Sequence, residues 1–244
     1  VLMGASALPK MFPMLMTAAG TVTPARVLIV GAGVAGLQAI ATARKLGAMV
    51  QAYDIRPDVK EQILSLGAKF VEMELETTGT QDKSGYAKAQ DETFYRKQRE
   101  LMTKVISDSD LVITTAAVPG KKAPILVTKE MVSKMARGSV VVDLAAERGG
   151  NCELTRAGET VIENGVSVIG PVNLPSSVPN HASQLYAKNL SNFLLYLVTK
   201  EGQIKVDPND DILRDTLVVQ NGEIVHAALK NAAPPPQPVG ASAS

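Results

Sequence analysis

The sequence predicts an α/β fold in which a doubly wound parallel sheet is followed by the C-terminal part of a second domain. From Ala25 onward, short aliphatic runs alternate with helix-like stretches, which is typical of a parallel sheet with crossover helices. The runs at 27–30 and 140–142 are apolar at every position, as expected for strands that are covered on both faces. After Pro171 the alternation ends, so the remaining residues are expected to belong to a different unit.

The composition excludes several classes of function. The 244 residues suit one or two domains, and 25 Lys and Arg against 24 Asp and Glu give a net charge of +1. This balance offers no strongly basic face, so we expect no nucleic-acid partner. Cys152 is the only cysteine and cannot form an internal disulfide or a multi-cysteine metal site. No run approaches the roughly 20 apolar residues of a membrane-spanning helix, so we expect a soluble piece.

The elements of the sheet follow in order along residues 25–180. The predicted strands are 26–30, 49–53, 69–73, 111–115, 139–144 and 167–169. The predicted helices between them are 34–46, 57–66, 87–106 and 129–135.

Residues 181–228 are expected to return to the second domain. A long helix is predicted at 182–199, with leucines and Phe193 on its apolar side. The apolar runs 217–219 and 224–225 flank Asn221-Gly222, a dipeptide that strongly indicates a β-hairpin. Residues 229–244 are rich in proline and are expected to be an extended tail.

A glycine motif indicates a site for phosphate. Gly31, Gly33 and Gly36 form G-x-G-x-x-G between a predicted strand and a predicted helix. Gly31 permits the tight turn, Gly33 lets the backbone approach a pyrophosphate, and Gly36 lets the helix pack close to the sheet. The pyrophosphate then lies at the positive end of the helix dipole. The alternative interpretation of the glycines is a tight turn without a ligand.

Asp54 strengthens the dinucleotide interpretation. It ends the next predicted strand, 23 residues after Gly31, where a carboxylate accepts a hydrogen bond from the adenosine ribose. Residues 25–180 are therefore predicted to be a dinucleotide-binding Rossmann domain. Asp54 repels a 2′-phosphate and favours NAD(H), whereas Arg56 could pair with that phosphate and favour NADP(H). We give the carboxylate more weight, and Arg56 is equally well interpreted as a solvated turn residue.

The rest of the chain offers no catalytic group. His181 is expected to cap or pack at the start of the long helix, and His226 to lie on the surface. We therefore predict no catalytic residue and no metal site, and expect the nicotinamide to supply the redox chemistry. The strand ends at 114–117 and 143–147 are expected near the cofactor crevice, where Asp143 either orients backbone or touches cofactor.

Residues 76–95 are expected to form a mobile loop. From 76 to 93 this segment contains no Val, Ile, Leu, Met or Phe, and it is longer than most connections between a strand and a helix. Long loops without a core of their own are often functional.

Several motifs together resemble one family. They are Thr-Ala-Ala-Gly at 17–20, the glycine motif at 31–36, Asp-Ile-Arg-Pro at 54–57, Gly-Tyr-Ala-Lys at 85–88, Pro-Gly-Lys-Lys-Ala-Pro at 119–124, Val-Asp-Leu-Ala-Ala-Glu at 142–147 and Gly-Gly-Asn-Cys at 149–152. With them, the chain resembles the NAD(H)-binding domain, domain I of the alpha subunit, of proton-translocating NAD(P) transhydrogenase. It resembles alanine dehydrogenase more distantly, because that family lacks the Gly-Tyr-Ala-Lys loop.

The resemblance implies a set of contacts to NAD(H). Gly31, Gly33 and Val34 would contact the pyrophosphate. At the adenosine end the contacts would be Asp54, Ile55 and Arg56. Gly85 would contact the nucleotide from the mobile loop, and Leu144 would lie near the crevice. The loop at 76–95 would then close over the nucleotide and exclude water.

The resemblance also implies that residues 1–24 are a connecting helix from an N-terminal half-domain that this chain lacks. It further implies partners and a reaction. In the intact complex, hydride passes between NAD(H) and NADP(H), and the transfer is coupled to proton translocation. An NADP(H)-binding domain and a membrane domain would be the partners of this chain, with a second copy forming a homodimer. The chain would be peripheral to the membrane, on the cytoplasmic or matrix side, and hydride transfer by it alone is not implied. The alternatives are an alanine dehydrogenase-like enzyme and a non-catalytic NAD-binding module.

Overall fold

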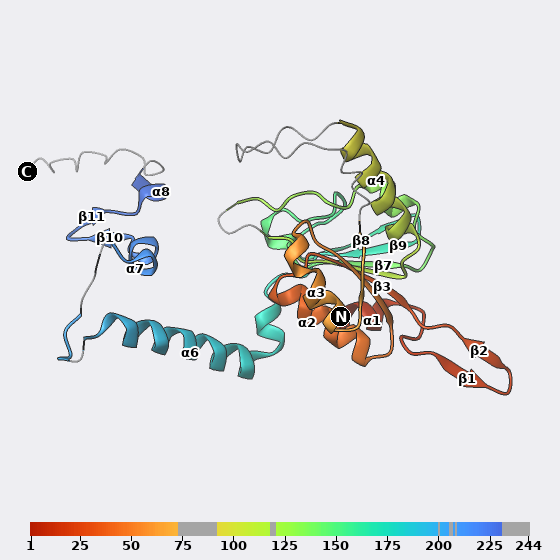
Figure 1. Cartoon of the computed structure of the whole chain (residues 1–244), viewed down its shortest axis with the longest axis horizontal. Coiled ribbons are helices and arrows are strands. Elements are labelled where there is room, and N and C mark those ends of the chain that lie inside the picture. Colours follow the sequence, from red (N-terminus) through yellow and green to blue (C-terminus); the bar gives the residue numbers. More distant parts are fainter. Residues whose placement is uncertain (73–91, 118–120, 200, 205–206, 208, 231–244) are drawn as a thin grey trace, which may run out of the picture. The chain divides into compact units, whose positions relative to one another are not determined.

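The computed structural model describes residues 1–72, 92–117, 121–199, 201–204, 207 and 209–230 (Figure 1). The chain divides into two compact units, Val1–Leu174 and Pro175–Ser244. The boundary lies at 174/175, six residues before the expected end of the first domain at 180.

The first unit is built on a seven-stranded sheet with the order β5-β4-β3-β6-β7-β9-β8. Neighbouring strands are parallel except for β8, which pairs with β9 in the antiparallel sense. The strands are β3 (Arg26–Val30), β4 (Met49–Tyr53), β5 (Lys69–Phe70), β6 (Leu111–Thr114), β7 (Val140–Asp143), β8 (Thr160–Glu163) and β9 (Val166–Ile169). The α/β prediction with a mostly parallel, doubly wound sheet is confirmed.

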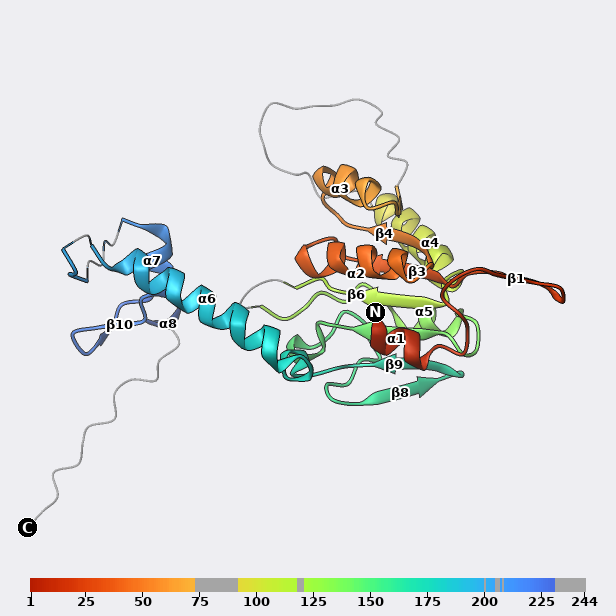
Figure 2. The same cartoon turned by 90° about the horizontal axis from the view of Figure 1, so that it is seen from below.

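Helices cover both faces of this sheet (Figures 1 and 2). The α-helices of the unit are α1 (Leu2–Ala7), α2 (Val34–Lys45), α3 (Lys60–Ser65), α4 (Glu92–Ser107) and α5 (Lys129–Ser133). Short 3₁₀ turns occur at Pro57–Val59 and Ala146–Arg148, and a third, Leu174–Ser177, crosses the boundary between the units.

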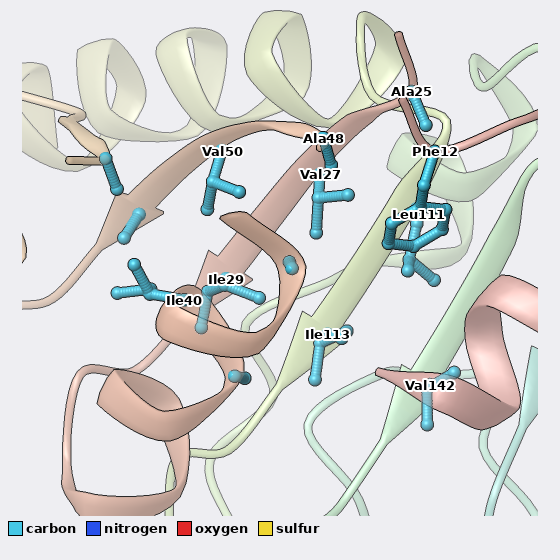
Figure 3. Packing of buried hydrophobic residues seen from close by; sticks show 14 of the residues in the cluster. Phe12, Ala25, Val27, Ile29, Ile40, Ala48, Val50, Leu111, Ile113 and Val142 are labelled. Carbon is cyan, nitrogen blue, oxygen red and sulfur yellow. The ribbon is translucent and has the colours of Figure 1, made fainter. Parts of the chain in front are cut away.

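The core lies on the two faces of the sheet, because alternate residues of each strand point to opposite sides. On one face, Val27 and Ile29 of β3 pack with Ile40 of α2 (Figure 3). On the other face, Leu28 and Val30 pack in the cluster that holds the buried residues of α4 and α5. The strands that read as continuous apolar runs are therefore the ones buried between two layers.

The N-terminal segment corrects one prediction. Instead of a connecting helix over residues 1–24, the chain forms α1 and then an exposed hairpin of β1 (Leu15–Thr17) and β2 (Gly20–Val22), which projects from the sheet in both views (Figures 1 and 2). The helix ends early because Leu8 precedes Pro9, and a residue before proline is driven from the helical to the extended conformation, which Leu8 adopts. Gly20 supports the hairpin turn with a φ of 128°.

Two strands of the seven-stranded sheet differ from the predictions by more than one residue at an end. Strand β8 was not predicted, although Asn164 and Gly165 between β8 and β9 have φ of 52° and 79°, the positive values that a tight hairpin turn requires. Strand β5 spans Lys69–Phe70 rather than 69–73, and residue 73 lies outside the described residues.

The second unit contains the predicted long helix and hairpin. Helix α6 spans Pro179–Leu197 and starts three residues earlier than predicted, because Pro179 occupies the first helical turn, where proline is favoured. The remaining elements are α7 (Asp211–Thr216), β10 (Val219–Gln220), β11 (Glu223–Ile224) and α8 (Ala227–Lys230). Asn221 and Gly222 form the predicted turn between β10 and β11. The proline-rich tail at 231–244 lies outside the described residues.

Within the described part of the chain, every helix is too short or too polar to cross a membrane.

Candidate nucleotide-binding site

A cleft lies at the carboxyl edge of the sheet, where the strand order reverses. From β3 the chain runs outward through β4 and β5 and then returns to the other side of β3 as β6. In open α/β sheets this switch point is where ligands bind. The cleft has a volume of about 540 Å³ and is lined by Val30, Gly31, Gly33, Tyr53, Asp54, Ile55, Arg56, Thr115, Ala116, Ala117, Pro124 and Leu126.

Two of the motif glycines are required by close packing around the turn after β3. Gly31 has a φ of 99°, and a Cβ atom there would lie 2.7 Å from Oγ1 of Thr115. A Cβ atom on Gly36 would lie 1.9 Å from the carbonyl oxygen of Gly31, which is backbone and cannot rotate away. The Thr115 hydroxyl donates a hydrogen bond of 2.9 Å to that same carbonyl. The turn is thus fixed between α2 and the end of β6.

Gly33 has a different role, because a Cβ atom there would have no neighbour within 4 Å. It is the N-cap of α2 and contributes no side chain to the backbone N–H groups of the first turn. Val34, the first helical residue, is 91% exposed, and no acidic residue lies in that turn. The open space therefore meets the positive end of a twelve-residue helix, which is the geometry that favours a bound phosphate.

Asp54 lies at the end of β4 and its carboxylate accepts four hydrogen bonds. The backbone N–H of Ala32 donates to Oδ2 at 2.7 Å, which ties the carboxylate to the glycine turn. The backbone N–H of Arg56 donates to Oδ1 at 2.9 Å. The guanidinium of Arg56 donates to both oxygens, from Nε to Oδ1 at 3.0 Å and from Nη2 to Oδ2 at 3.1 Å. Arg56 and Asp54 therefore enter the lining of the cleft as a bonded pair.

The pKa of Asp54 is lowered from its ordinary value. Burial, which leaves the residue only 9% exposed, acts to raise the pKa by disfavouring the charged form. The hydrogen bonds from the Arg56 guanidinium and from two backbone N–H groups, together with the guanidinium charge, outweigh this effect. The carboxylate is consequently ionised at neutral pH and places a negative charge, paired with Arg56, in the lining of the cleft.

The structure brings five of the predicted binding residues to the cleft lining, namely Gly31, Gly33, Asp54, Ile55 and Arg56. Gly36 lies behind the turn, and Val34 is exposed at the start of α2. Leu144 is half-buried and packs against the core, with its N–H donating to the Thr114 carbonyl at 2.9 Å. Gly85 and most of the loop at 76–95 lie outside the described residues.

Sequence reasoning missed part of the cleft wall. Pro124 and Leu126 line the cleft from the connection between β6 and α5. Pro124 belongs to the motif at 119–124, but that motif was not assigned to the cleft. Tyr53 lines it from the end of β4, where its position directly before Asp54 was an available signal. Thr115 was expected near the crevice, but its hydrogen bond to Gly31 joins residues 84 positions apart and has no local signature.

The remaining polar residues do not form a second reactive centre in the described part of the chain. Burial raises the pKa of the Cys152 thiol to about 11, so this thiol is protonated at neutral pH. No group of three His, Cys, Asp or Glu residues that could hold a metal ion occurs among the described residues. Asp143 is fully buried and hydrogen-bonded to backbone, as the orienting interpretation of this residue predicted.

Comparison with known proteins gives matches along most of the chain. The family described as alanine dehydrogenase/PNT, C-terminal domain, matches residues 1–227. A relative from Rhodospirillum rubrum, the first part of a divided NAD(P) transhydrogenase subunit alpha, is 51% identical over 231 residues, which are 94% of this chain and 60% of that protein. The chain thus spans about three fifths of the length of this relative.

Two solved structures have the same fold. A transhydrogenase from Sinorhizobium meliloti aligns with a TM-score of 0.79 and 44% identity, over 92% of this chain and 59% of that one. An L-alanine dehydrogenase aligns with a TM-score of 0.73 and 28% identity, over 95% of this chain and 60% of that one.

Proposed function

The chain belongs to the alanine dehydrogenase/PNT C-terminal domain family, and we propose that its cleft binds NAD(H) as the nucleotide-binding component of a transhydrogenase. The observation that supports this most directly is the pairing of two recognition elements in one cleft. Gly33 opens the N-terminus of α2 to a pyrophosphate, and Asp54 presents a carboxylate for a ribose. A dinucleotide carries both of these groups in one molecule.

The chain contributes binding and orientation, and the nicotinamide supplies the hydride chemistry when it is bound. The first turn of α2 holds the phosphates, Asp54 accepts from the ribose, and Ala116 and Ala117 allow close approach of the nucleotide on the β6 side. With Ile55 and Leu126 on its walls the cleft is largely apolar, which limits water around the reacting groups.

NAD(H) is proposed over NADP(H) on the charge of Asp54. A 2′-phosphate on the adenosine ribose would approach an ionised carboxylate whose pKa is lowered. The Arg56 guanidinium cannot receive that phosphate freely, because it is already paired with both oxygens of Asp54.

The complete reaction requires more than this chain. We propose that hydride passes between NAD(H) here and NADP(H) on a second domain, with proton translocation by a membrane domain of the same complex. The name of the Rhodospirillum rubrum relative denotes one portion of a divided subunit, which supports a larger assembly. The chain would then be a peripheral component on the cytoplasmic or matrix side, present as a homodimer.

The second candidate function is an alanine dehydrogenase-like activity, which the similarity to a solved L-alanine dehydrogenase favours. A non-catalytic NAD-binding module is the third. All three functions require NAD(H) in the cleft. They differ in whether hydride is transferred and in which molecule exchanges it with NAD(H).

The test is a titration of the full chain with NADH and with NADPH. Binding is monitored through the fluorescence of the dihydronicotinamide ring. We expect NADH to bind and NADPH to bind at least about tenfold more weakly, as the charge on Asp54 requires. Equal affinities would contradict the role given to Asp54, and no NADH binding would refute the site. Hydride transfer to NADP⁺ after addition of an NADP(H)-binding transhydrogenase component would then separate a transhydrogenase from the other two candidates.

A further inference from the structure

One wall of the cleft is made of residues without regular secondary structure. Ala116, Ala117, Pro124 and Leu126 belong to the connection between β6 and α5, and in its described residues this connection forms no helix or strand ladder before Val127. Such a segment needs hydrogen bonds from outside to stay in one place. The source of these bonds determines how the wall is held against the glycine turn on the opposite side.

Asn151 supplies hydrogen bonds at both ends of this wall. Its side-chain Nδ2 donates to the carbonyl oxygens of Ala116 and Pro124, both at 2.8 Å. Its backbone carbonyl accepts from the N–H groups of Leu126 at 2.8 Å and Val127 at 3.0 Å. One residue that does not itself line the cleft therefore holds three that do.

Asn151 is in turn fixed by the buried carboxylate of Asp143 at the end of β7. Oδ2 of Asp143 accepts from the N–H of Asn151 at 2.7 Å and from the hydroxyl of Thr155 at 2.6 Å. Gly150 permits this approach, because it has a φ of 78° and a Cβ atom there would lie 2.8 Å from the same oxygen. The wall is thus connected to the sheet through two buried polar residues.

The chemistry at position 151 is restrictive. Two carbonyl oxygens face one amide NH₂ group, so the side chain must donate twice and carry no negative charge. The residue is 0% exposed, and among the described residues its Oδ1 has no hydrogen-bond partner. A buried oxygen without a hydrogen bond lowers the stability of the fold. Fold stability alone therefore does not explain why an amide side chain occupies this position.

We propose that Asn151 is a positioning residue for the nucleotide, which sets the distance between the glycine turn and the wall made by Ala116, Ala117, Pro124 and Leu126. This proposal rests on the proposed binding of NAD(H) in the cleft. Loss of the two donated hydrogen bonds would free the wall to move. The larger effect would be on the free energy of nucleotide binding, and the smaller effect on the free energy of unfolding.

The decisive comparison is between Asn151→Asp and Thr155→Val in the full chain. Asn151→Asp keeps the shape but places oxygen against the two carbonyl groups. Thr155→Val is a matched control, because it removes one hydrogen bond from the same Asp143 oxygen and leaves the bonds to Ala116 and Pro124 in place. Both variants are measured for thermal stability, NADH affinity and the emission of bound NADH at saturation.

We expect Asn151→Asp to bind NADH about tenfold more weakly, with an emission spectrum shifted toward that of free NADH. Thr155→Val is expected to lower the melting temperature and to weaken NADH binding by much less than Asn151→Asp does, because the hydrogen bonds from Asn151 to Ala116 and Pro124 remain. Equal effects of the two variants on binding, or an unchanged NADH affinity in Asn151→Asp, would overturn the positioning role.

Amide hydrogen exchange in the wild-type protein gives a second test that does not depend on a variant folding. We expect NADH to slow exchange in residues 121–127 and also in residues 150–153, with 160–169 unchanged as an internal control. Unchanged exchange at 150–153 on NADH binding would contradict the proposal. Wild-type protein that binds no NADH would instead refute the proposed function, so the two failures are distinguishable.

Discussion

At the scale of single residues, the three motif glycines serve different physical purposes. Gly31 and Gly36 are required by contacts that exist in the folded chain, whereas Gly33 faces open space. The sequence motif alone treats all three as parts of one pattern. The structure therefore predicts different outcomes when a methyl group is added at each.

Gly36→Ala and Gly33→Ala form a matched pair. The Cβ atom at position 36 would meet the Gly31 carbonyl at 1.9 Å, so we expect a loss of about 1–3 kcal/mol in the free energy of unfolding. The Cβ atom at position 33 meets nothing, so that loss should stay below about 1 kcal/mol while NADH affinity falls about tenfold. Denaturant unfolding and NADH titration measure both quantities. Equal stabilities of the two variants would contradict the assignment.

Arg56→Gln tests the electrostatics of Asp54. Because the folded-state pKa of Asp54 is lowered, its ionisation contributes stability that is fully present above the ordinary pKa of about 4 and is lost as the pH falls through the lowered value. Removing the guanidinium takes away a main cause of the lowering. The free energy of unfolding of the variant should therefore be lower than that of the wild type at pH 7. This difference between the two proteins should become smaller below about pH 4.

The measurement is denaturant unfolding of Arg56→Gln and wild type between about pH 3 and 7. Arg156→Gln is the control, because Arg156 pairs with Glu159 at 3.8 Å on the surface and such exposed pairs contribute little. A stability difference for Arg56→Gln that does not change with pH would show that the guanidinium does not govern the ionisation of Asp54.

At the scale of elements, the sequence predicted what depends on local pattern. The buried strands β3, β6 and β7 were visible as uninterrupted apolar runs, and the glycine motif and Asp54 pointed to residues that line the cleft, namely Gly31, Gly33 and Asp54. These signals are local because each lies within one strand or one turn.

The features that the sequence did not predict depend on weak hydrophobic patterns or on contacts between residues that are distant in the sequence. Strand β8 alternates between exposed and half-buried residues at the sheet edge, so it has no apolar run. The exposed β1 and β2 hairpin has too little buried surface to impose a pattern on its sequence. The support of the cleft wall by Asn151 joins residues that are 35 and 27 positions apart, and no spacing rule records such contacts.

At the scale of the whole chain, the candidate site belongs to one of the two units. Every residue that lines the cleft, and the network around Asp143 that supports it, falls within Val1–Leu174. The residues of α6 in the second unit are exposed or half-buried, and none is fully buried. Nucleotide binding is thus expected to depend on the first unit alone.

A protein consisting of residues 1–174 should fold and bind NADH with the affinity of the full chain. The reason is that both hydrophobic clusters of the sheet are complete within this unit. Circular dichroism establishes folding of the fragment, and NADH titration compares the two proteins. A folded fragment that binds NADH more weakly than the full chain would show that residues after 174 contribute to the site.

The reversal of strand order at β3 also has a consequence for how the chain acquires its structure during synthesis. Strand β4 follows β3 closely and can pair with it early, but the other edge of β3 stays open until Leu111–Thr114 has been made. An unpaired edge of apolar residues is a template for association with other chains. The nascent protein is therefore most prone to aggregate before β6 emerges, and the cleft, which residues after β6 also line, forms only after that stage.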